Sequence, residues 1–315
     1  MGAVITGVGV ALPEKTITNA DLEARMDTTD AWIVERTGIH ERRIGGTTAG
    51  LATEAGNKAL ADAGLGPDDI DLLVLATTSP DRQVPGTSAT VCAKLGLRGG
   101  AMDVNAACTG FVYGLVAANG VLALGGSVRR VLVIGAETLS RITDWDDRGT
   151  AILFADGAGA AVVEACDGPG QLLGWDLGAD GNAEGILYAD HGDYIRMEGR
   201  EVFRRATRVM VDSSQRALAM AGLTTDDVDL LVPHQANIRI IKAANDRLGI
   251  PMDKTAVVIH RTGNSSSATI PTALCDAIEN GRVHDGSIVL LVGFGAGLTW
   301  AAAVLRWGEG RPARR

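Results

Sequence analysis

The sequence predicts an α/β fold assembled from two copies of one structural unit, and three observations support this prediction. The segment ALADAGLGPDDIDLLV at Ala59–Val74 returns as ALAMAGLTTDDVDLLV at Ala217–Val232, an offset of 217 − 59 = 158 residues. The same offset relates VLVIG at Val131–Gly135 to VLLVG at Val289–Gly293. In both halves, short apolar runs alternate with helical patterns, which is typical of mixed sheets covered by helices.

Each half can be divided into its elements by the same rule. Short uninterrupted apolar runs predict buried strands, whereas longer segments with apolar residues three and four apart predict helices. The first half gives strands at 3–13, 72–78, 100–108 and 131–137, and helices at 87–96 and 109–124. The second gives strands at 227–233, 256–264 and 287–295, and helices at 238–249 and 269–281. A glycine-rich stretch at 166–199 separates them, so we expect halves at 1–170 and 171–315.

Composition narrows the class of protein. Of the 315 residues, 46% are hydrophobic, and the formal net charge is −9, so generic binding to nucleic acid or to an anionic membrane is not expected. The four cysteines show no Cys-x-x-Cys pairing, which indicates free thiols in a reducing compartment and no metal site. Because no apolar run approaches about 18 residues, we expect a soluble, cytoplasmic protein without a membrane span.

Two glycine motifs are candidate binding loops. In TGVGVALP, Leu12 stands where the dinucleotide fingerprint requires its third glycine, so we set dinucleotide binding aside. GFGAG at Gly293–Gly297 is better explained as a turn whose backbone N–H groups can face an oxyanion, which is the donor arrangement that acyl transfer requires.

Candidate catalytic groups follow three predicted strands. Cys108 lies between a strand and an apolar helix, where the helix amino terminus favours thiolate over thiol. His234 and Asn264 also follow strands, so the three side chains would meet at one edge. Simpler explanations stay open: Cys108 as a buried core residue, His234 as a helix cap and Asn264 as a turn residue. His260 is a rival imidazole, but we expect it within a strand.

Five segments together carry a family resemblance. NAACTGF around Cys108, PHQANIRI around His234, GNSSSATIP around Asn264, GFGAGLTW and DAWIVERTGIHERR resemble β-ketoacyl-acyl carrier protein synthase III, a thiolase-fold condensing enzyme. The resemblance implies a duplicated five-layer αβαβα architecture, an acyl-CoA primer and malonyl-acyl carrier protein as substrates, no cofactor, and a homodimer.

The resemblance also implies roles for site residues. Cys108 would accept the acyl group, and the backbone N–H groups of Cys108 and Ala296 would hold the oxyanion. His234 and Asn264 would donate hydrogen bonds to the enolate that forms when malonyl thioester loses CO2. Phe294 resembles the apolar wall beside the site, and Val84, in the loop 80–88, is expected to line the acyl pocket.

Substrate-binding residues follow by the same comparison. The CoA site would use Thr28, Trp32, Arg36, Arg148 and Asn237, since an indole face and planar guanidinium groups suit adenine and phosphates. Without the resemblance, Trp32 and Arg36 would be a surface helix pair. The acidic carrier protein would bind a basic patch, for which we expect Arg204, Gln235, Arg239, Lys242 and Arg247. A solvated helix face is the alternative, because Asp246 interrupts the run.

Other classes fit the sequence less well. A thiolase would need a second cysteine at the GFGAG turn, and a chalcone synthase relative would usually have proline there. A cysteine hydrolase also orders Cys, His and Asn along the chain, but the flanking residues and the two repeated halves argue against it. A non-catalytic scaffold stays open. The second-ranked function is an acyltransferase of the same fold or a priming ketosynthase of a polyketide pathway, and the primer is not predicted.

Overall fold

The computed structural model describes residues 2–308, and its first sheet has five strands. In spatial order they are β1 (Gly2–Ala11), β7 (Asp156–Cys166), β6 (Arg130–Thr138), β4 (Leu72–Ala76) and β5 (Gly100–Val104). β4 pairs in parallel with β5 and β6, whereas β7 is antiparallel to both β1 and β6. The result is a mixed sheet whose edge strand β5 is largely exposed.

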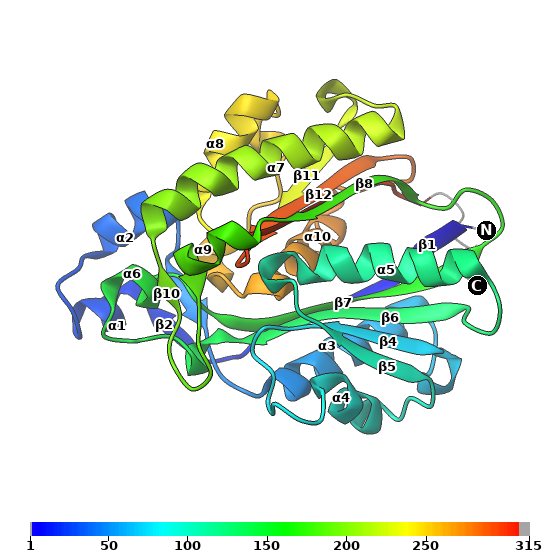
Figure 1. The fold of residues 1–315 in the computed structure, drawn as a ribbon, viewed down its shortest axis with the longest axis horizontal. Helices are drawn as coiled ribbons and strands as arrows, with labels where there is room; N and C mark the ends of the chain where they lie inside the picture. The colour runs from blue at the N-terminus through cyan, green and yellow to red at the C-terminus, as the bar shows by residue number, and fades with distance from the viewer. Residues whose placement is uncertain (1, 309–315) are drawn as a thin grey trace.

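The second sheet has four strands, and helices fill the layers around both sheets (Figure 1). Its strands are β11 (Leu230–Pro233), β12 (Ile288–Gly295), β13 (Thr299–Arg306) and β8 (Leu172–Ala179). The outer helices of the first sheet are α3 (Thr48–Ala63) and α4 (Thr87–Leu95), those of the second are α7 (Gly199–Ala221) and α8 (Ile238–Leu248), and those between the sheets are α5 (Gly110–Leu124) and α10 (Thr269–Glu279). The predicted five-layer αβαβα architecture is therefore confirmed.

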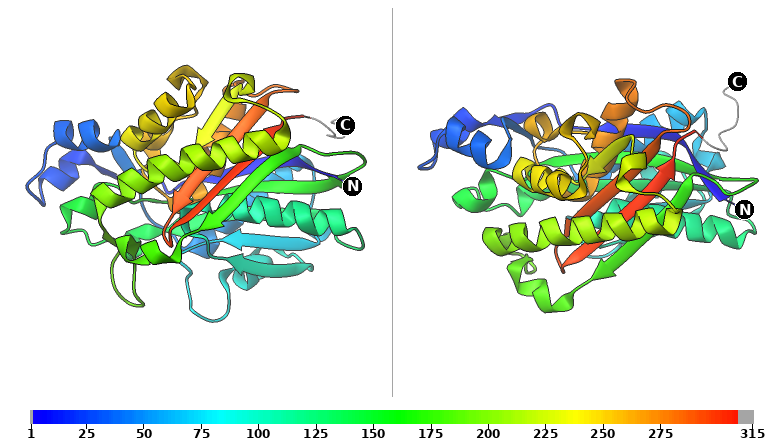
Figure 2. Two further views of the ribbon diagram at one scale, coloured as in Figure 1. Left: turned by 45° about the horizontal axis from the view of Figure 1, so that its top comes forward. Right: turned by 90° about the horizontal axis from the view of Figure 1, so that it is seen from above.

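Smaller elements gather at one end of the layers (Figures 1 and 2). They are β2 (Thr16–Thr18), β3 (Glu41–Arg43), β9 (Leu187–Tyr188), β10 (Arg196–Met197), α1 (Asn19–Glu23), α2 (Asp30–Thr37), α6 (Arg148–Ala151) and α9 (Ile259–Thr262). The 3₁₀ turns are η1 (Pro67–Asp69), η2 (Ala107–Thr109), η3 (Leu139–Arg141), η4 (Gly181–Ile186), η5 (Thr225–Asp227), η6 (Met252–Lys254) and η7 (Ser266–Ala268). Figure 2 also shows α7 crossing the outer face of the second sheet.

The sequence repeat is a structural repeat with the same register. Leu72 on β4 pairs with Val131 on β6, and Leu230 on β11 pairs with Val289 on β12. The offsets agree, since 230 − 72 = 158 and 289 − 131 = 158. The two units are thus copies at the level of hydrogen-bonded partners. The boundary near residue 170 stays a prediction.

The predicted strand at 256–264 is wrong. Only an isolated bridge joins Thr255 to β11, and residues 259–262 form the short helix α9. The Gln235 side chain accepts hydrogen bonds from the N–H groups of Val258 and Ile259 at 3.0 and 3.3 Å, so these groups are not available to a sheet. His260 accordingly lies on a helix and not within a strand.

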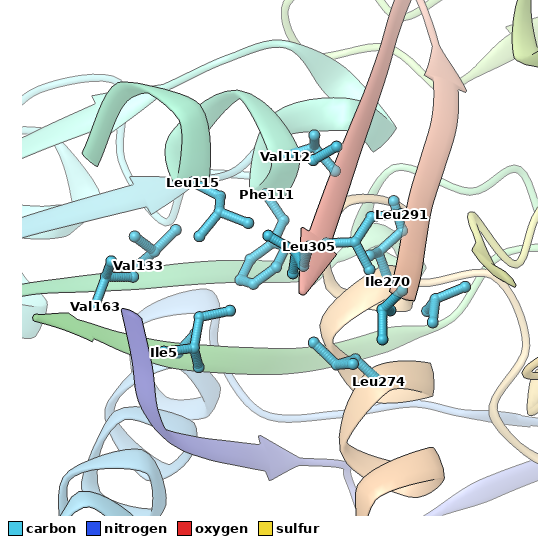
Figure 3. Packing of buried hydrophobic residues seen from close by; sticks show 14 of the residues in the cluster. Ile5, Phe111, Val112, Leu115, Val133, Val163, Ile270, Leu274, Leu291 and Leu305 are labelled. Carbon is cyan, nitrogen blue, oxygen red and sulfur yellow. The ribbon is translucent and has the colours of Figure 1, made fainter. Parts of the chain in front are cut away.

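The central core lies between the two sheets, around α5 and α10 (Figure 3). Phe111 and Leu115 of α5 pack with Ile270 and Leu274 of α10 in one buried cluster that includes both sheets. By length and composition alone, the segment Ala107–Leu124 could cross a membrane, and it is the one such helix in the part of the chain that the structure describes. More than half of that segment is buried inside the protein, as expected for a helix between two sheets.

The glycines of TGVGVALP serve packing. A Cβ atom at Gly9 would lie 2.4 Å from the carbonyl oxygen of Ala55, and one at Gly7 would lie 2.3 Å from that of Ala59. Both oxygens belong to α3, so β1 approaches this helix closely because two of its residues have no side chain.

We therefore expect Gly9→Ala to destabilise the protein by about 1–3 kcal/mol, since the added methyl group must displace backbone. Gly120→Ala is the matched control, because Gly120 is exposed on α5 and a Cβ there meets nothing within 4 Å. The control should be neutral or stabilising by about 0.5–1 kcal/mol. Urea unfolding midpoints measure both, and an unchanged midpoint for Gly9→Ala would contradict the close approach.

Candidate active site

Cys108 lies in the 3₁₀ turn η2, which leads directly into α5. The residue before it, Ala107, has φ of 47°, a left-handed conformation that costs a non-glycine residue energy. Gly295 at the end of β12 lies directly against this turn, because a Cβ there would be 2.7 Å from the Cys108 nitrogen. Strained backbone and a glycine contact together position the cysteine.

Cys108 is not set up as a resting thiolate. Its relative exposure is 9%, and burial raises the pKa of the thiol to about 12. The Ser266 side chain offsets part of this effect. A helix amino terminus stabilises an anion by at most about 2 kcal/mol, or about 1.5 pKa units, which is smaller than the effect of burial. The expectation of a favoured thiolate is therefore wrong, and Cys108 needs a group that takes its proton.

His234 follows β11 and is buried at 1% exposure. Its backbone N–H donates to Val292 O at 2.7 Å, and its Nδ1 lies 2.6 Å from Thr269 Oγ1. The ring packs edge-on against Phe294, with centroids 5.6 Å apart. Burial lowers the pKa of the imidazole to about 3, so His234 is neutral at physiological pH.

Asn264 is 5% exposed and is fixed by hydrogen bonds on backbone and side chain. Its N–H donates to Leu153 O, and its carbonyl accepts from Ala155 N, both at 2.9 Å. Its Oδ1 accepts from Ser266 N at 2.9 Å, which leaves Nδ2 as the side-chain atom that can donate to a bound ligand. Ser266 has φ of 46° and, with Ala107, is one of two non-glycine residues with positive φ among residues 2–308.

The three side chains share one cavity. A cavity of about 610 Å³ is lined by Cys108, His234, Asn264 and Phe294, and it extends to Trp32 and Arg36. A second cavity of about 450 Å³ also reaches Cys108. Its apolar lining includes Leu139, Ile142, Phe154, Leu187 and Ile195. Cys108 thus lies where the two cavities meet.

The turn that carries Ala296 is tied to the cysteine turn. Ala296 and Cys108 both line the second cavity. Thr299 Oγ1 lies 3.0 Å from Ala106 O and 3.2 Å from Ala296 O, and Thr109 Oγ1 donates to it at 3.1 Å. Thr109 and Thr299 were not selected from the sequence, because nothing in their spacing indicates that they meet.

Phe294 lines the main cavity, as expected for an apolar wall. Val84 does not line either cavity. Val84 is 81% exposed on the loop before α4, so the prediction that it lines the acyl pocket of its own chain is wrong. None of the loop residues 80–88 lines either cavity.

The predicted CoA residues lie around Trp32 on α2. Arg36 Cζ lies 4.5 Å and Arg148 Cζ 4.7 Å from the centre of the Trp32 ring, and Arg148 also donates to Asp27 O. Asn237 lines the main cavity and caps α8 by accepting from Arg239 N at 2.8 Å. Thr28 lies outside that lining, and its buried Oγ1 has no hydrogen-bond partner among the described residues.

A buried arginine that the sequence analysis missed supports this region. Arg42 is fully buried and donates to Ile152 O at 2.7 and 3.0 Å and to Asn19 Oδ1 at 2.7 Å. Asn19 in turn donates to Asp30 Oδ1, at the start of α2, at 2.7 Å. Burial lowers the pKa of Arg42 to about 10. The network holds the helix that carries Trp32 beside the segment that follows Arg148.

The predicted carrier-protein patch is only partly available. Arg239, Lys242 and Arg247 are exposed on α8. Arg204, on α7, forms a bidentate ion pair with Glu201. Gln235 is wrong as a surface contact, because it is fully buried and donates to Pro233 O and Ala256 O while accepting from the 258–259 backbone.

Glu137 is a second buried group that sequence reasoning did not find. It accepts hydrogen bonds from Ser79 Oγ at 2.6 Å and Ser267 Oγ at 2.7 Å, and burial raises its pKa. It therefore joins the segment after β4 to the turn η7, next to Asn264. Within residues 2–308, no group of three or more His, Cys, Asp or Glu side chains is arranged to hold a metal ion.

Two family models match the chain. The family model described as 3-oxoacyl-[acyl-carrier-protein (ACP)] synthase III matches residues 102–181, and that of its C-terminal part matches residues 218–307. These segments contain Cys108, His234 and Asn264.

Similar proteins cover nearly the whole chain. The β-ketoacyl-[acyl-carrier-protein] synthase III of Bacillus pumilus is 50% identical over 314 residues, which is 98% of this chain and 100% of the relative. The crystal structure of the Aquifex aeolicus 3-oxoacyl-[acyl-carrier-protein] synthase III is 45% identical with a TM-score of 0.95, covering 97% of this chain and 100% of that one. The priming β-ketosynthase of the R1128 polyketide pathway is 36% identical with a TM-score of 0.91, and the match covers 97% of this chain and 96% of that one. This chain belongs to the β-ketoacyl-acyl carrier protein synthase III family of thiolase-fold condensing enzymes.

Proposed function

We propose that the protein condenses an acyl-CoA primer with malonyl-acyl carrier protein, releasing CO2 and CoA and giving the β-ketoacyl-acyl carrier protein that starts fatty acid synthesis. Family membership over the full chain supports the reaction. One observation supports the site: Cys108 borders two cavities, and the larger also contains a neutral imidazole and an amide donor.

The first half-reaction would load the primer. Cys108 Sγ attacks the thioester carbonyl, the carbon–sulfur bond to CoA breaks, and the acyl group stays on the cysteine. The developing oxyanion would be held by the backbone N–H groups of Cys108 and Ala296. Removing one such donor typically costs about 3–4 kcal/mol of transition-state stabilisation.

The second half-reaction would form the carbon–carbon bond. Malonyl thioester loses CO2, and the enolate oxygen would be held by Asn264 Nδ2 and His234. The enolate carbon attacks acyl-Cys108, and the released cysteine thiolate takes a proton from solvent, so one proton is consumed overall. Phe294 would help to exclude water that could hydrolyse the acyl-enzyme.

Intact-mass measurement after mixing with acyl-CoA tests the nucleophile. Wild type should gain the mass of one acyl group, and Cys108→Ala should gain none. Cys92→Ala is the control, because Cys92 is half-buried on α4 and lines neither cavity. Acyl loading that persists in Cys108→Ala would place the nucleophile elsewhere.

We also propose separate binding surfaces for the two substrates. Trp32, Arg36, Arg148 and Asn237, with Thr28 nearby, would hold the CoA nucleotide. Arg148 now lies against the indole, so a stacked adenine would have to displace it. Arg239, Lys242 and Arg247 would attract the acidic carrier protein, and Arg204 less so because Glu201 neutralises it.

Two variants separate these surfaces, and each is the control for the other. Trp32→Ala should raise KM for acyl-CoA about tenfold, the effect of losing about 1.4 kcal/mol of stacking, without changing KM for malonyl-acyl carrier protein. Lys242→Glu should raise KM for malonyl-acyl carrier protein without changing KM for acyl-CoA. Steady-state kinetics with each substrate varied in turn measures both, and equal effects on both substrates would contradict the division.

A homodimer through the exposed edge of the first sheet is our further proposal. β5 is an edge strand whose Met102 is 36% exposed, and Val84, also exposed, belongs to a neighbouring loop. Unprotected sheet edges favour pairing with another chain.

Cytoplasmic location and the absence of any cofactor stay predictions.

Met102→Glu should shift the protein toward monomer in sedimentation velocity at micromolar concentration, because it places a charge at the proposed contact. Met220→Glu on α7 is the control, since Met220 is 59% exposed and lies on the outer layer of the other sheet. A monomeric wild type, or a dimer that both variants leave unchanged, would reject this interface.

The priming role in a polyketide pathway is the second candidate. The 36% identity to the R1128 priming ketosynthase supports it less than the 50% identity to the Bacillus pumilus relative supports the fatty acid role. The same intact-mass experiment with a panel of acyl-CoA thioesters would identify the primer.

A further inference from the structure

Thr269, the first residue of α10, contacts the catalytic histidine directly. Thr269 Oγ1 lies 2.6 Å from His234 Nδ1, and both side chains are at most 2% exposed. An oxygen and a nitrogen at this distance share one hydrogen atom, so one of them donates and the other accepts. Which of them donates determines where the proton of a neutral imidazole sits.

The second hydrogen bond of Thr269 favours one direction in the resting site. Its hydroxyl also lies 2.9 Å from the carbonyl oxygen of Ser266, and a carbonyl can only accept. A hydroxyl has one proton, and here it is directed to Ser266 O. His234 Nδ1 must then carry the hydrogen of the shorter contact. This arrangement gives both short contacts of the hydroxyl a hydrogen, whereas the opposite one leaves the contact between Thr269 Oγ1 and Ser266 O without one. Ser266 O also accepts from the Thr269 N–H in either case.

We propose that Thr269 is the positioning residue that fixes the tautomer of His234, with hydrogen on Nδ1 and a free lone pair on Nε2, so that Nε2 accepts the Cys108 thiol proton during acyl loading. The proposal rests on the function proposed above. Since Nδ1 is engaged with Thr269, Nε2 is the ring nitrogen left to the cavity that Cys108 also lines.

The proton balance of loading is then complete. As the bond forms between Sγ and the thioester carbon, the thiol proton moves to Nε2. As the bond to CoA breaks, the proton moves from Nε2 to the CoA sulfur, which leaves as a thiol. His234 returns to its resting form. The transfer must be concerted with formation of the Sγ–carbon bond, because an imidazole of pKa about 3 cannot hold the proton of a thiol of pKa about 12 before the thiol becomes a thioester.

The charged groups around Cys108 and His234 do not replace His234 Nε2 as the acceptor of the thiol proton. Glu137, from β6, is the carboxylate that acts on Cys108, and it raises the thiol pKa. Arg36, Arg200 and Arg239 line the same cavity from α2, α7 and α8, and they are cations that cannot accept a proton.

The second half-reaction then depends on Asn264. With hydrogen on Nδ1, His234 cannot donate through Nε2, so the enolate oxygen is held by Asn264 Nδ2 in this tautomer. His234 can also donate a hydrogen bond to the enolate oxygen only in the tautomer that carries hydrogen on Nε2. Thr269 could support that form by turning its hydroxyl toward Nδ1. Removing the hydroxyl should therefore affect the two half-reactions differently.

The test compares Thr269→Val, which keeps the shape and removes the hydroxyl, with wild type. Single-turnover acyl loading by intact mass should slow about a hundredfold at pH 7, a typical contribution of a general base. Wild-type loading should be independent of pH from about 5 to 9, because the imidazole pKa is about 3 and the thiol pKa is about 12. Loading by Thr269→Val should rise tenfold per pH unit, since it must use the thiolate fraction.

Thr269→Ser should load at nearly the wild-type rate, because the hydroxyl is restored. Thr272→Val is the matched control, since Thr272 is buried on the same helix and its Oγ1 has no hydrogen-bond partner among the described residues. It should load normally and over a flat pH range. Thermal melting of all three variants checks that they fold.

A second measurement separates this proposal from its alternative. Decarboxylation of malonyl-acyl carrier protein, followed in a Cys108→Ala background, should be as fast or faster with Thr269→Val, because hydrogen on Nε2 is then permitted. Slower decarboxylation with unchanged loading, or equal losses in both, would overturn the proposal. Absence of loading on wild-type Cys108 would instead reject the proposed function itself.

Discussion

The site depends on one strained turn, at Ser266. With φ of 46°, its N–H reaches Asn264 Oδ1, its carbonyl accepts from Thr269 beside His234, and its side chain acts on Cys108. The energy of this conformation must come from the surrounding contacts. These contacts come from the other half of the chain. Glu137 accepts a hydrogen bond from the Ser267 side chain, and Gly135 lies against the backbone of Ser267. The two repeated units therefore meet at the chemistry.

Burial determines which chemistry is possible there. It raises the pKa of Cys108 and lowers that of His234, so both groups are neutral and no thiolate–imidazolium pair forms in the resting site. A neutral pair attracts water less than an ion pair, which suits a site that must hold an acyl thioester without hydrolysing it. The cost is that attack requires a directed proton acceptor, and so the orientation of one imidazole becomes decisive.

The sequence predicted what depends on periodicity and strand ends, and it missed what depends on side chains meeting across the chain. The repeat identified the paired sheets, and the positions after strands identified Cys108, His234 and Asn264, which share a cavity. The resemblance placed Gln235 in the carrier-protein patch. Its amide instead holds residues 256–259, and for the same reason the strand expected there is absent. Arg42 and Thr269 gave no signal, because Arg42 meets Ile152 at a separation of 110 residues and Thr269 meets His234 at a separation of 35.

The duplication also explains why Thr269 is available for this role. The turn Asn105–Ala107 is matched by Asn264–Ser266, an offset of 266 − 107 = 159, and each asparagine accepts from the N–H of its positive-φ residue. At this offset Gly110, which begins α5, corresponds to Thr269, which begins α10. Gly110 has no room for a side chain, since a Cβ there would lie 2.8 Å from that of Ala76. The same backbone device thus presents a nucleophile in one half, and in the other it leaves space for the hydroxyl that orients the base.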